Sequence, residues 1–334
     1  MSVLTPHVYV GIVTYNSASL MPRCLTALFG QTYAPISITV LDNRSTDAIR
    51  KVMQRYSAVS FVANAANVGF GAGHNEIIRR TRLKSRDYYL AVNPDAVLDA
   101  QYIQRLLTSC ENHHADWGVG KLYKSMHAKT LYSVGHALLR DGYAFNIGYN
   151  QMDSGQYDDG KEIFGAPGAA ARYRGSLIHS LSRGHNFFDP ALFVYYEDVD
   201  IDWRAHLAHN HCWYESTAIA EHAGGIPSPV FISEALSNRF LSVIKNASLA
   251  DLIFINIPIV AAHILFRLVM TPKVGFAIIH KVSSQMPDML RQRKKLVVTG
   301  SDMSLWFQKA MAEKSGQPRR FAQRFIAFKT QWFG

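Results

Sequence analysis

The segment Tyr88-Tyr-Leu-Ala-Val-Asn-Pro-Asp95 decides how the rest of the chain is interpreted. An apolar run from Tyr89 to Val92 leads directly into Asn93-Pro94-Asp95. Continuous hydrophobicity predicts a strand buried on both faces, and proline ends such a strand because it has no N–H for the ladder. Ligands of open α/β sheets bind outside the carboxyl ends of the strands, so we expect Asp95 at a ligand site. A carboxylate there suits a hard divalent cation that bridges protein and phosphate oxygens. The alternative is that Asp95 is the N-cap of a helix that starts near Ala100, and the tripeptide alone favours this alternative.

Strand and helix patterns alternate ahead of this segment. The predicted elements are strands over Val8 to Val13, Ile36 to Leu41 and Val59 to Val62, and helices over Leu20 to Phe29 and Ile49 to Tyr56. This alternation predicts βαβ units and therefore a parallel sheet. Polar residues follow the first two strands at Thr14-Tyr15-Asn16 and at Asp42-Asn43, so successive strand ends are expected to line one crevice.

A glycine-rich stretch, Asn67-Val-Gly69-Phe-Gly71-Ala-Gly73-His-Asn75, precedes a helix predicted over Glu76 to Arg82. Glycines let the backbone approach a ligand, and a helix N-terminus offers free N–H groups to a phosphate. The spacing is Gly-x-Gly-x-Gly rather than the dinucleotide-binding pattern, and a structural turn explains it almost as well.

The second acidic segment is Tyr195-Tyr-Glu-Asp-Val-Asp-Ile-Asp202. Acids in the first turn of a helix favour its dipole, which accounts for Asp200 and Asp202. Glu197 and Asp198 are explained less well in this way. Neighbouring carboxylates raise one another's pKa, a useful property in a general base. Between the two acidic segments, residues 131–160 are rich in Gly, Tyr and Asp and predict a loop or hairpin region over the site.

The composition is that of an intracellular globular protein. With 334 residues, 48% of them apolar, the chain can bury a sizeable core. The odd number of scattered cysteines (Cys24, Cys110 and Cys212) argues against a disulfide scaffold and fits a reducing compartment. No basic-then-apolar leader precedes Val8, so no secretory signal is predicted. The histidines at positions 206, 209 and 211 lack the partners of a zinc site and are interpreted as packing or surface residues.

The net charge of +10 belongs to the C-terminal region, because residues 261–334 hold 13 Lys/Arg against 3 Asp/Glu. This excess indicates an anionic partner. The apolar stretch Leu249 to Met270 is interrupted by Asp251 and Arg267, which disfavours a membrane span. For this C-terminal region, a pair of helices that lie in an anionic membrane interface is favoured over an ordinary helical subdomain packed on the core. No motif supports nucleic-acid binding. The basic residues of this proposed interface are Lys273, Lys281, Arg291, Arg293, Lys294 and Lys295.

The motifs together resemble the family 2 glycosyltransferases, particularly their bacterial rhamnosyltransferase-like branch, over about residues 8 to 225. The resemblance is carried by the number, order and spacing of short motifs: Thr14-Tyr-Asn16, Asp42-Asn43, Asn67 to Asn75, Asn93-Pro-Asp95, Gly165-Ala-Pro-Gly168, Tyr195 to Asp200, and His222-x-x-Gly225. It implies a GT-A fold, a mixed and mostly parallel sheet flanked by helices. The expected organisation is a catalytic domain over 1–226, with a nucleotide-sugar half (1–99) and an acceptor half (100–226), followed by a helical basic and apolar region over 227–334.

The resemblance also implies roles for individual residues. Asp198 matches the catalytic base, and Asp95 and His222 match the two protein ligands of Mg²⁺ or Mn²⁺, with Asn93 in place of the first acid of Asp-x-Asp. Donor contacts are expected from Thr14, Tyr15, Asn16, Asp42, Asn67, Gly69, Gly73, Asn75, Asn93 and Asp95. Acceptor contacts are expected from Gly168, Ala169, Glu197 and Trp203.

The implied activity is that of an inverting, metal-dependent hexosyltransferase of cell-surface polysaccharide biosynthesis. The implied donor is dTDP-β-L-rhamnose, with UDP-sugars such as UDP-galactofuranose as the alternative. The implied acceptor is a glycan or a polyprenyl-diphosphate-linked saccharide. A cytoplasmic enzyme on the inner face of the cell membrane is therefore expected, with homo-oligomerisation left open. Two other classes are a silent relative within a glycan-assembly complex and a nucleotidyltransferase, which would need a basic residue near Gly69 to Gly73 that is absent.

Overall fold

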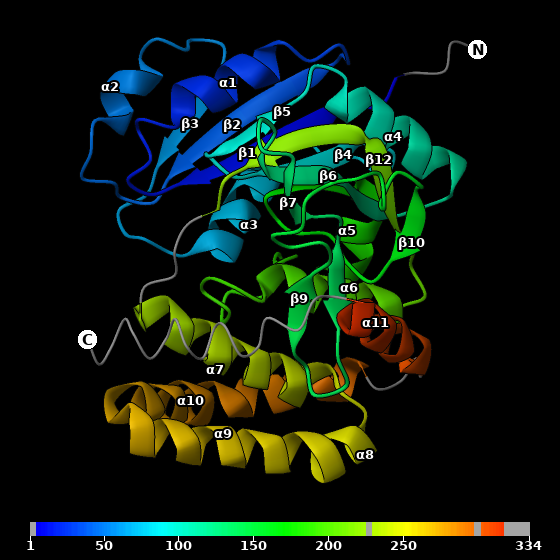
Figure 1. Cartoon of the computed structure of the whole chain (residues 1–334). Coiled ribbons are helices and arrows are strands. Elements are labelled where there is room, and N and C mark those ends of the chain that lie inside the picture. Colours follow the sequence, from blue (N-terminus) through cyan, green and yellow to red (C-terminus); the bar gives the residue numbers. More distant parts are fainter. Residues whose placement is uncertain (1–4, 225–228, 297–301, 317–334) are drawn as a thin grey trace.

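The computed structural model describes residues 5–224, 229–296 and 302–316. Its α/β part lies at the top of Figure 1, and a layer of long helices lies at the bottom. The main sheet has ten strands, in the order β10-β12-β6-β11-β4-β1-β2-β3, with β5 paired to β12 and β7 to β6. The strands of the main sheet are β1 (Val8–Thr14), β2 (Ile36–Asp42), β3 (Ser60–Ala63), β4 (Tyr88–Val92), β5 (Ala96–Leu98), β6 (Trp117–Ser125), β7 (Thr130–Ser133), β10 (Lys161–Ile163), β11 (Ala170–Arg174) and β12 (Cys212–His222).

The N-terminal half is the parallel sheet that the alternating pattern predicted. Strands β1, β2, β3 and β4 are parallel, and the register pairs Thr14 with Asp42 and Ile12 with Val92. The carboxyl ends of β1, β2 and β4 therefore meet at one edge of the sheet. Helices α1 (Met21–Phe29), α2 (Ile49–Met53) and α3 (Phe70–Arg80) form the crossovers.

Helix α3 begins six residues earlier than the glycine-rich stretch suggested, at Phe70 rather than Glu76. Of the three glycines in this stretch, only Gly69 has a positive φ, of 85°, and it is the N-cap residue of α3. Gly71 and Gly73 lie inside the helix because it packs closely: an added Cβ would come within 2.9 Å of Phe188 Cβ and of the Val13 methyls, respectively. Helix-to-sheet packing therefore explains these two glycines.

Two strand pairings, β11 with β4 and β12 with β5, join the first half of the chain to the second half. Strand β11 is antiparallel to both β4 and β6, whereas β12 is parallel to β6. The end of β12 is also antiparallel to β5, with His222 opposite Ala96. Since β5 follows Asp95 directly, this pairing brings the end of β12 to the Asn93-Pro94-Asp95 turn. The N-cap of α4 (Tyr102–Asn112) is Gln101, so the alternative of Asp95 as a helix cap is wrong.

The region over the site is built from short elements and α6. A two-stranded sheet of β8 (His136–Leu138) and β9 (Ala144–Asn146) occupies the segment predicted as a loop or hairpin. Helices α5 (Gly175–Leu181) and α6 (Glu197–Leu207) follow β11.

Most of the C-terminal helices form their own layer, and the last of them lies above that layer, beside α6 (Figure 1). They are α7 (Pro229–Asn246), α8 (Leu249–Asp251), a π-helical turn η1 (Leu252–Asn256), α9 (Ile257–Met270), α10 (Pro272–Leu296) and α11 (Ser304–Gly316). A second hydrophobic cluster, which includes Val199, Trp203, Val243 and Trp306, packs α6 against α7 and α11.

A buried ionic network also joins α7 to α6. The ammonium group of Lys245 lies 2.7 Å from Asp189 and 2.8 Å from Asp200. Asn246 and Arg204 donate to the two oxygens of Asp200, each at 2.9 Å. Burial would raise the pKa of Asp200, but the Lys245 and Arg204 charges outweigh it and hold that pKa well below its usual range. The helical layer is therefore fixed to α6 by charge as well as by apolar packing.

Candidate active site

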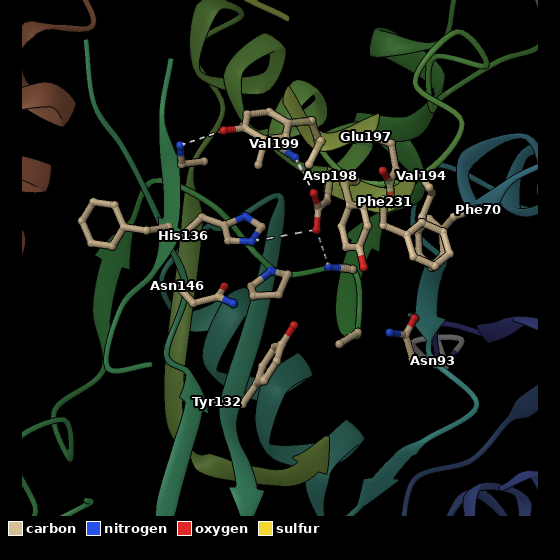
Figure 2. A pocket seen from close by; sticks show the side chains of 18 residues that line it. Phe70, Asn93, Tyr132, His136, Asn146, Val194, Glu197, Asp198, Val199 and Phe231 are labelled. Carbon is tan, nitrogen blue, oxygen red and sulfur yellow. Dashed lines mark hydrogen bonds and ion pairs between the residues drawn. The ribbon is translucent and has the colours of Figure 1, made fainter. Parts of the chain in front are cut away.

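One cavity of about 410 Å³ lies between the sheet edge, α6 and α7 (Figure 2). Its polar lining combines Asn93 from the sheet edge with Glu197 and Asp198 from α6. The rest of its wall includes Phe70, Tyr132, His136, Phe145, Asn146, Pro167, Gly168, Ala169, Val194, Tyr195, Tyr196, Val199 and Phe231. The cavity is thus lined by the second acidic segment and reaches the first one through Asn93, next to which Asp95 and His222 lie.

At the sheet edge, a histidine stands between two predicted site residues. His222 Nε2 lies 3.1 Å from Asp95 Oδ1 and 3.0 Å from Asn93 Nδ2. His222 is 4% exposed, and the ring of Tyr132 packs edge-on against it at 4.4 Å. Burial raises the pKa of Asp95, but the hydrogen bond and charge of His222 outweigh that effect, so this pKa lies below its ordinary value. Residues 93, 95 and 222 therefore form one cluster, as predicted.

The donor set of this cluster fits a divalent cation that takes its remaining ligands from substrate. An imidazole nitrogen and a carboxylate oxygen 3.1 Å apart can share one ion. His222 Nδ1 is buried and finds no hydrogen-bond partner among the described residues. No group of three or more His, Cys, Asp or Glu with metal-site geometry occurs within residues 5–224, 229–296 and 302–316. Asp95 and His222 thus offer two protein ligands, which suits a cation held mainly by phosphate and water.

The predicted nucleotide end lies at the carboxyl ends of β1 and β2. Thr14 and Asp42 are buried and opposite each other, and Asp42 Oδ1 accepts from the Ser45 amide at 2.9 Å. The Thr14 hydroxyl has no partner among the described residues. Beside them, the Tyr15 side chain is 52% exposed, and Asn16 accepts a 2.8 Å hydrogen bond from Thr46 N.

The glycine-rich stretch contributes packing where donor contacts were expected. A Cβ on Gly69 would lie 2.2 Å from the Phe193 carbonyl oxygen, and Gly73 faces Val13 and Leu41. The Asn75 side chain is buried and fully used, since its Oδ1 accepts from two backbone amides and its Nδ2 donates to Phe188 O at 2.8 Å. The predicted donor contacts of Gly73 and Asn75 are therefore wrong: these residues fix α3 to β1 and to residues 187–188. Asn67, in turn, is exposed and caps the Gly69 amide at 2.9 Å.

Asp198 projects from the first turn of α6 into the cavity (Figure 2). Its Oδ2 accepts from the Gly168 amide at 3.0 Å, and its Oδ1 accepts from the Val199 amide at 2.8 Å. The absence of a side chain at position 168 leaves room for the Phe70 ring, because a Cβ there would lie 3.1 Å from Phe70. Ala169 supports the opposite wall, since its carbonyl accepts from Asn93 N at 2.9 Å. Gly168 and Ala169 thus lie between the two acidic segments.

A histidine that the sequence did not single out stands behind Asp198. His136 Nδ1 lies 2.9 Å from Asp202 Oδ2, and His136 Nε2 lies 3.9 Å from Asp198 Oδ2. Asp202 is fully buried, and its other oxygen accepts from Trp117 Nε1 at 2.9 Å. Burial lowers the pKa of His136, but the carboxylates of Asp198 and Asp202 outweigh it, so this pKa lies above the ordinary value.

The two acceptor residues predicted on α6 differ in their surroundings. Glu197 is 5% exposed, lines the cavity, and has one carboxylate oxygen without a partner among the described residues. Burial, and then the charge of Asp198, raises its pKa well above the usual range. Trp203 is 1% exposed and packs in the second hydrophobic cluster, so its predicted acceptor contact is wrong. At helical spacing, a position five residues after Asp198 lies on the core side of α6.

The turn that leads into α6 is strained. Tyr195 and Tyr196 have φ values of 67° and 71°, a conformation that non-glycine residues rarely adopt. Asn238 on α7 holds this turn by donating to the carbonyls of Val194 and Tyr195, both at 2.8 Å. Tyr195 then contacts Phe231 edge-on at 5.8 Å. The first helix of the C-terminal layer therefore shapes the cavity directly.

The lining residues that were not singled out from the sequence include Tyr132, His136, Asn146 and Phe231. The first three lie on or beside the short strands β7, β8 and β9, whose sequence shows no long periodic pattern. Phe231 lies on α7, within a region interpreted only for its charge and hydropathy. The only available signal was the clustering of Tyr, Gly and Asp in residues 131–160. It predicted that this region lies over the site, but it did not indicate which of its residues line the cavity.

Comparison with known proteins agrees with this geometry. The family model "Glycosyl transferase family 2" matches residues 9–181, more than half of the chain. An N-acetylglucosaminyl-diphospho-decaprenol L-rhamnosyltransferase of Mycobacterium tuberculosis is 25% identical over 205 residues, covering 57% of this chain and 67% of that protein. Glycosyltransferase GlyA of Streptococcus pneumoniae is 26% identical over 115 residues, covering 34% of this chain but only 16% of that longer protein.

Solved structures of nucleotide-sugar enzymes share the fold. GalNAc-T7 with UDP, GalNAc and Mn²⁺ superposes with a TM-score of 0.56 at 11% identity, covering 73% of this chain and 48% of that one. The mannosyltransferase PcManGT from Pyrobaculum calidifontis, with GDP-Man and Mn²⁺, superposes with a TM-score of 0.53 at 13% identity, covering 99% of this chain and 88% of that one. S. aureus TarS with UDP superposes with a TM-score of 0.50 at 16% identity, covering 94% of this chain and 93% of that one. With the mixed sheet, the family match and these likenesses in hand, the chain belongs to glycosyl transferase family 2 and is a glycosyltransferase of GT-A fold.

Proposed function

We propose that the protein transfers a hexose, with inversion, from a nucleotide sugar to a lipid-linked or cell-surface glycan. The observation that carries this proposal is a cavity that both Asn93 and Asp198 line. Tyr132 lies between the two ends: its ring contacts His222, and burial and then the Asp198 charge raise its pKa. One end suits a diphosphate and the other suits a hydroxyl that must lose its proton.

In the proposed reaction, Asp198 accepts the proton of the acceptor hydroxyl while that oxygen attacks the anomeric carbon. One carbon–oxygen bond forms as the bond from sugar to diphosphate breaks, and the leaving diphosphate takes the electron pair. A single displacement of this kind inverts the anomeric centre without a covalent intermediate. The Gly168 and Val199 amides hold the Asp198 carboxylate for this step, and positioned general bases contribute roughly 10²–10⁴-fold to rates.

Asp95 and His222 would hold Mg²⁺ or Mn²⁺ at the other end, with Asn93 beside them. Such an ion neutralises charge that develops on a leaving diphosphate. Thr14, Tyr15, Asn16 and Asp42 would contact the base and ribose of the donor, at the strand ends where ligands of parallel sheets bind.

For the donor, dTDP-β-L-rhamnose is our first choice and a UDP-sugar the second. The mycobacterial relative is named as a rhamnosyltransferase that acts on a diphospho-decaprenol-linked sugar, which supports both rhamnose and a polyprenyl-diphosphate-linked acceptor. Glu197, Gly168 and Ala169 would contact the acceptor, because they line the same cavity as Asp198.

The C-terminal layer supports a membrane-bound acceptor through a large exposed apolar surface. The helical segment Leu249–Met270 is long and apolar enough to cross a membrane. Its apolar window has a mean hydropathy of 2.2, and only 6% of that window is buried inside the protein. Phe254 and Val269 are 78% and 71% exposed. Patches of this kind mark partner or membrane contacts in soluble proteins. The membrane-facing residues include Leu249, Ile253, Phe254, Ile257, Leu265, Phe266, Val269, Met270 and Phe276.

We place this segment in the interface rather than across the bilayer because its start is tied to the protein. Asp251 pairs with Arg140 at 2.7 Å, and the Asn256 side chain is buried. Three residues of the predicted basic face have partners within the protein: Lys281 pairs with Glu234, Arg291 pairs with Asp288, and Arg293 donates to Ile244 O at 3.0 Å. Lys273, Arg291 and Lys294 are exposed, and the side chain of Lys295 lies outside the described part. The proposed location is the cytoplasmic face of the cell membrane.

Donor binding is tested by thermal shift with dTDP-rhamnose and several UDP-sugars plus Mn²⁺, with and without chelator. We expect metal-dependent stabilisation that is lost in Asp95→Ala and retained in Asp99→Ala, an exposed acid four residues further on. Stabilisation by a UDP-sugar alone would keep the enzyme class and replace rhamnose. No stabilisation by any donor, with acceptor also present, would favour a catalytically silent relative.

Membrane binding is tested by sedimentation of the full chain with phosphatidylglycerol vesicles. Replacing Phe254 and Val269 by Ser is expected to weaken binding about tenfold or more, because each exposed side chain would lose its apolar burial. The matched control replaces Leu305 and Met311, exposed apolar residues of α11, in the same way. Unchanged vesicle binding together with conversion of an oligomer to a monomer would assign the surface to self-association.

A further inference from the structure

We propose that His136 is a positioning residue for Asp198: held by Asp202, its imidazole supports the Asp198 carboxylate at the oxygen that also accepts from the Gly168 amide. This inference rests on the proposed role of Asp198 as the base. Figure 2 shows the His136 ring directed at Asp198 across the wall of the cavity. His136 reaches this point from β8, 62 residues before Asp198 in the sequence.

The hydrogen bonds around the imidazole fix which nitrogen faces Asp198. Asp202 is an acceptor at Nδ1, at 2.9 Å, so Nδ1 carries hydrogen and Nε2 is turned toward Asp198 Oδ2. Asp202 is itself fixed, because its Oδ1 accepts from Trp117 Nε1 at 2.9 Å and from the Ala166 amide at 3.2 Å. Asp198 and Asp202 are four residues apart on α6 and so lie on one face of the helix. One imidazole therefore bridges two carboxylates of the same helix.

The charges that face His136 make this bridge electrostatic. The α6 residues that face the His136 ring are Asp198 and Asp202. Three further titratable groups lie around these two carboxylates: Tyr132 of β7, Tyr173 of β11 and Cys212 of β12. Burial, and then the charge of Asp198, of Asp202 or of both, raises the pKa of each of these three groups, so they are neutral at physiological pH. Asp198 and Asp202 are thus the charges next to the ring, and both favour the imidazolium form.

A protonated His136 would place a positive charge 3.9 Å from the Asp198 oxygen. This charge faces the Asp198 carboxylate at the wall of the cavity that the acceptor would enter. The 3.9 Å gap leaves the Asp198 proton-accepting orbitals free for the acceptor hydroxyl, because a full hydrogen bond to the ring is not formed. His136 takes no proton from the substrate in this scheme.

The first test measures the ring without any substrate. Long-range ¹H–¹⁵N spectra of the full chain, with His136→Gln for assignment, report the tautomer and pKa of His136. We expect hydrogen on Nδ1 and a pKa above 6.5 that falls in both Asp198→Asn and Asp202→Asn. A pKa that does not respond to Asp198→Asn would overturn the proposal.

The second test uses the pH dependence of kcat/KM with whichever donor the protein turns over. His136→Gln should lower kcat by roughly ten- to hundredfold with little change in donor KM. The alkaline limb that His136 sets should disappear from the pH profile. His206→Gln, a buried histidine that contacts Phe164 O, is the matched control. A uniform loss of activity with an unchanged pH profile would make His136 merely structural. If no donor is turned over, the proposed function fails while the spectra still decide the coupling.

Discussion

The two ends of the cavity are built in different ways. Asp95 and Asn93 follow one strand, and His222 is brought to them by backbone pairing of β12 with β5. Asp198 instead lies on α6, whose three aspartates are each met by a different part of the chain: Asp198 by the Gly168 amide before β11, Asp202 by His136 on β8, and Asp200 by Lys245 on α7. The sheet end is thus set by strand register. The helix end is set by side chains from distant segments.

The largest effect is expected at the helix end, from Asp198→Asn. The amide keeps the shape of the carboxylate but cannot accept the acceptor proton, so kcat should fall roughly 10²–10⁴-fold. Metal-dependent stabilisation by the donor should be unchanged, because Asp95 and His222 lie at the other end. Initial rates and thermal shift on the same preparations would separate the two ends. Loss of donor stabilisation in this variant would show that the ends are not independent.

The second effect concerns the anchoring of α6, in Lys245→Met. Removing the ammonium leaves Asp200 and Asp189 buried without their main counter-charge, which typically destabilises a protein by about 3–5 kcal/mol. Lys281→Met is the control, because its partly exposed pair with Glu234 should contribute no more than about 1 kcal/mol. Urea unfolding at pH 7 measures both. Equal losses in the two variants would contradict a special role for the buried network.

The same variant predicts a change in acid stability. The folded-state pKa of Asp200 is held low, so its stabilising contribution is present above its unfolded-state pKa and is lost as pH falls through the folded value. Without Lys245 the folded-state pKa rises, and acid unfolding should begin at a higher pH than in the wild type.

The smallest effect is expected on the sheet side, from Gly73→Ala. Alanine favours the helix by up to about 1 kcal/mol, but its Cβ would lie 2.9 Å from both Val13 methyls. Overpacking typically destabilises by about 1–3 kcal/mol, so a net loss of about 1 kcal/mol is expected. Gly30→Ala, where the nearest atom is 3.5 Å away, should change little. A stabilised Gly73→Ala would mean that the glycine serves a ligand rather than packing.

The same contrast explains how much the sequence could predict. Strands β1, β2 and β4 and the polar residues after them were predicted nearly to the residue, because local hydrophobic runs determine them. The cluster of Asp95 and His222 was predicted through a resemblance, and the β12–β5 register brings the two together. The structure also confirms that α9 and α10 are two successive helices.

Predictions were wrong or missing where packing between distant segments decides. Trp203 was assigned to the acceptor, but α7 and α11 cover its face of α6. Gly73 and Asn75 were assigned to the donor, but they are occupied by Val13 and by residues 187–188. His136 was not singled out, because nothing local to its short strand indicates that Asp202 lies beside it.

The network around Lys245 has a consequence for protein synthesis. Asp189 and Asp200 emerge from the ribosome well before Lys245 and Gln292, and Gln292 also donates to Asp189 at 3.0 Å. A nascent chain that ends before α7 therefore has Asp189 and Asp200 without Lys245, and only Arg204 remains as the cation beside Asp200, although the whole parallel sheet has already been translated. Catalytic competence should accordingly appear late in translation, at the time when the proposed membrane-facing helices become available. Coupling of this kind would keep unfinished chains inactive until the surface that brings them to their acceptor exists.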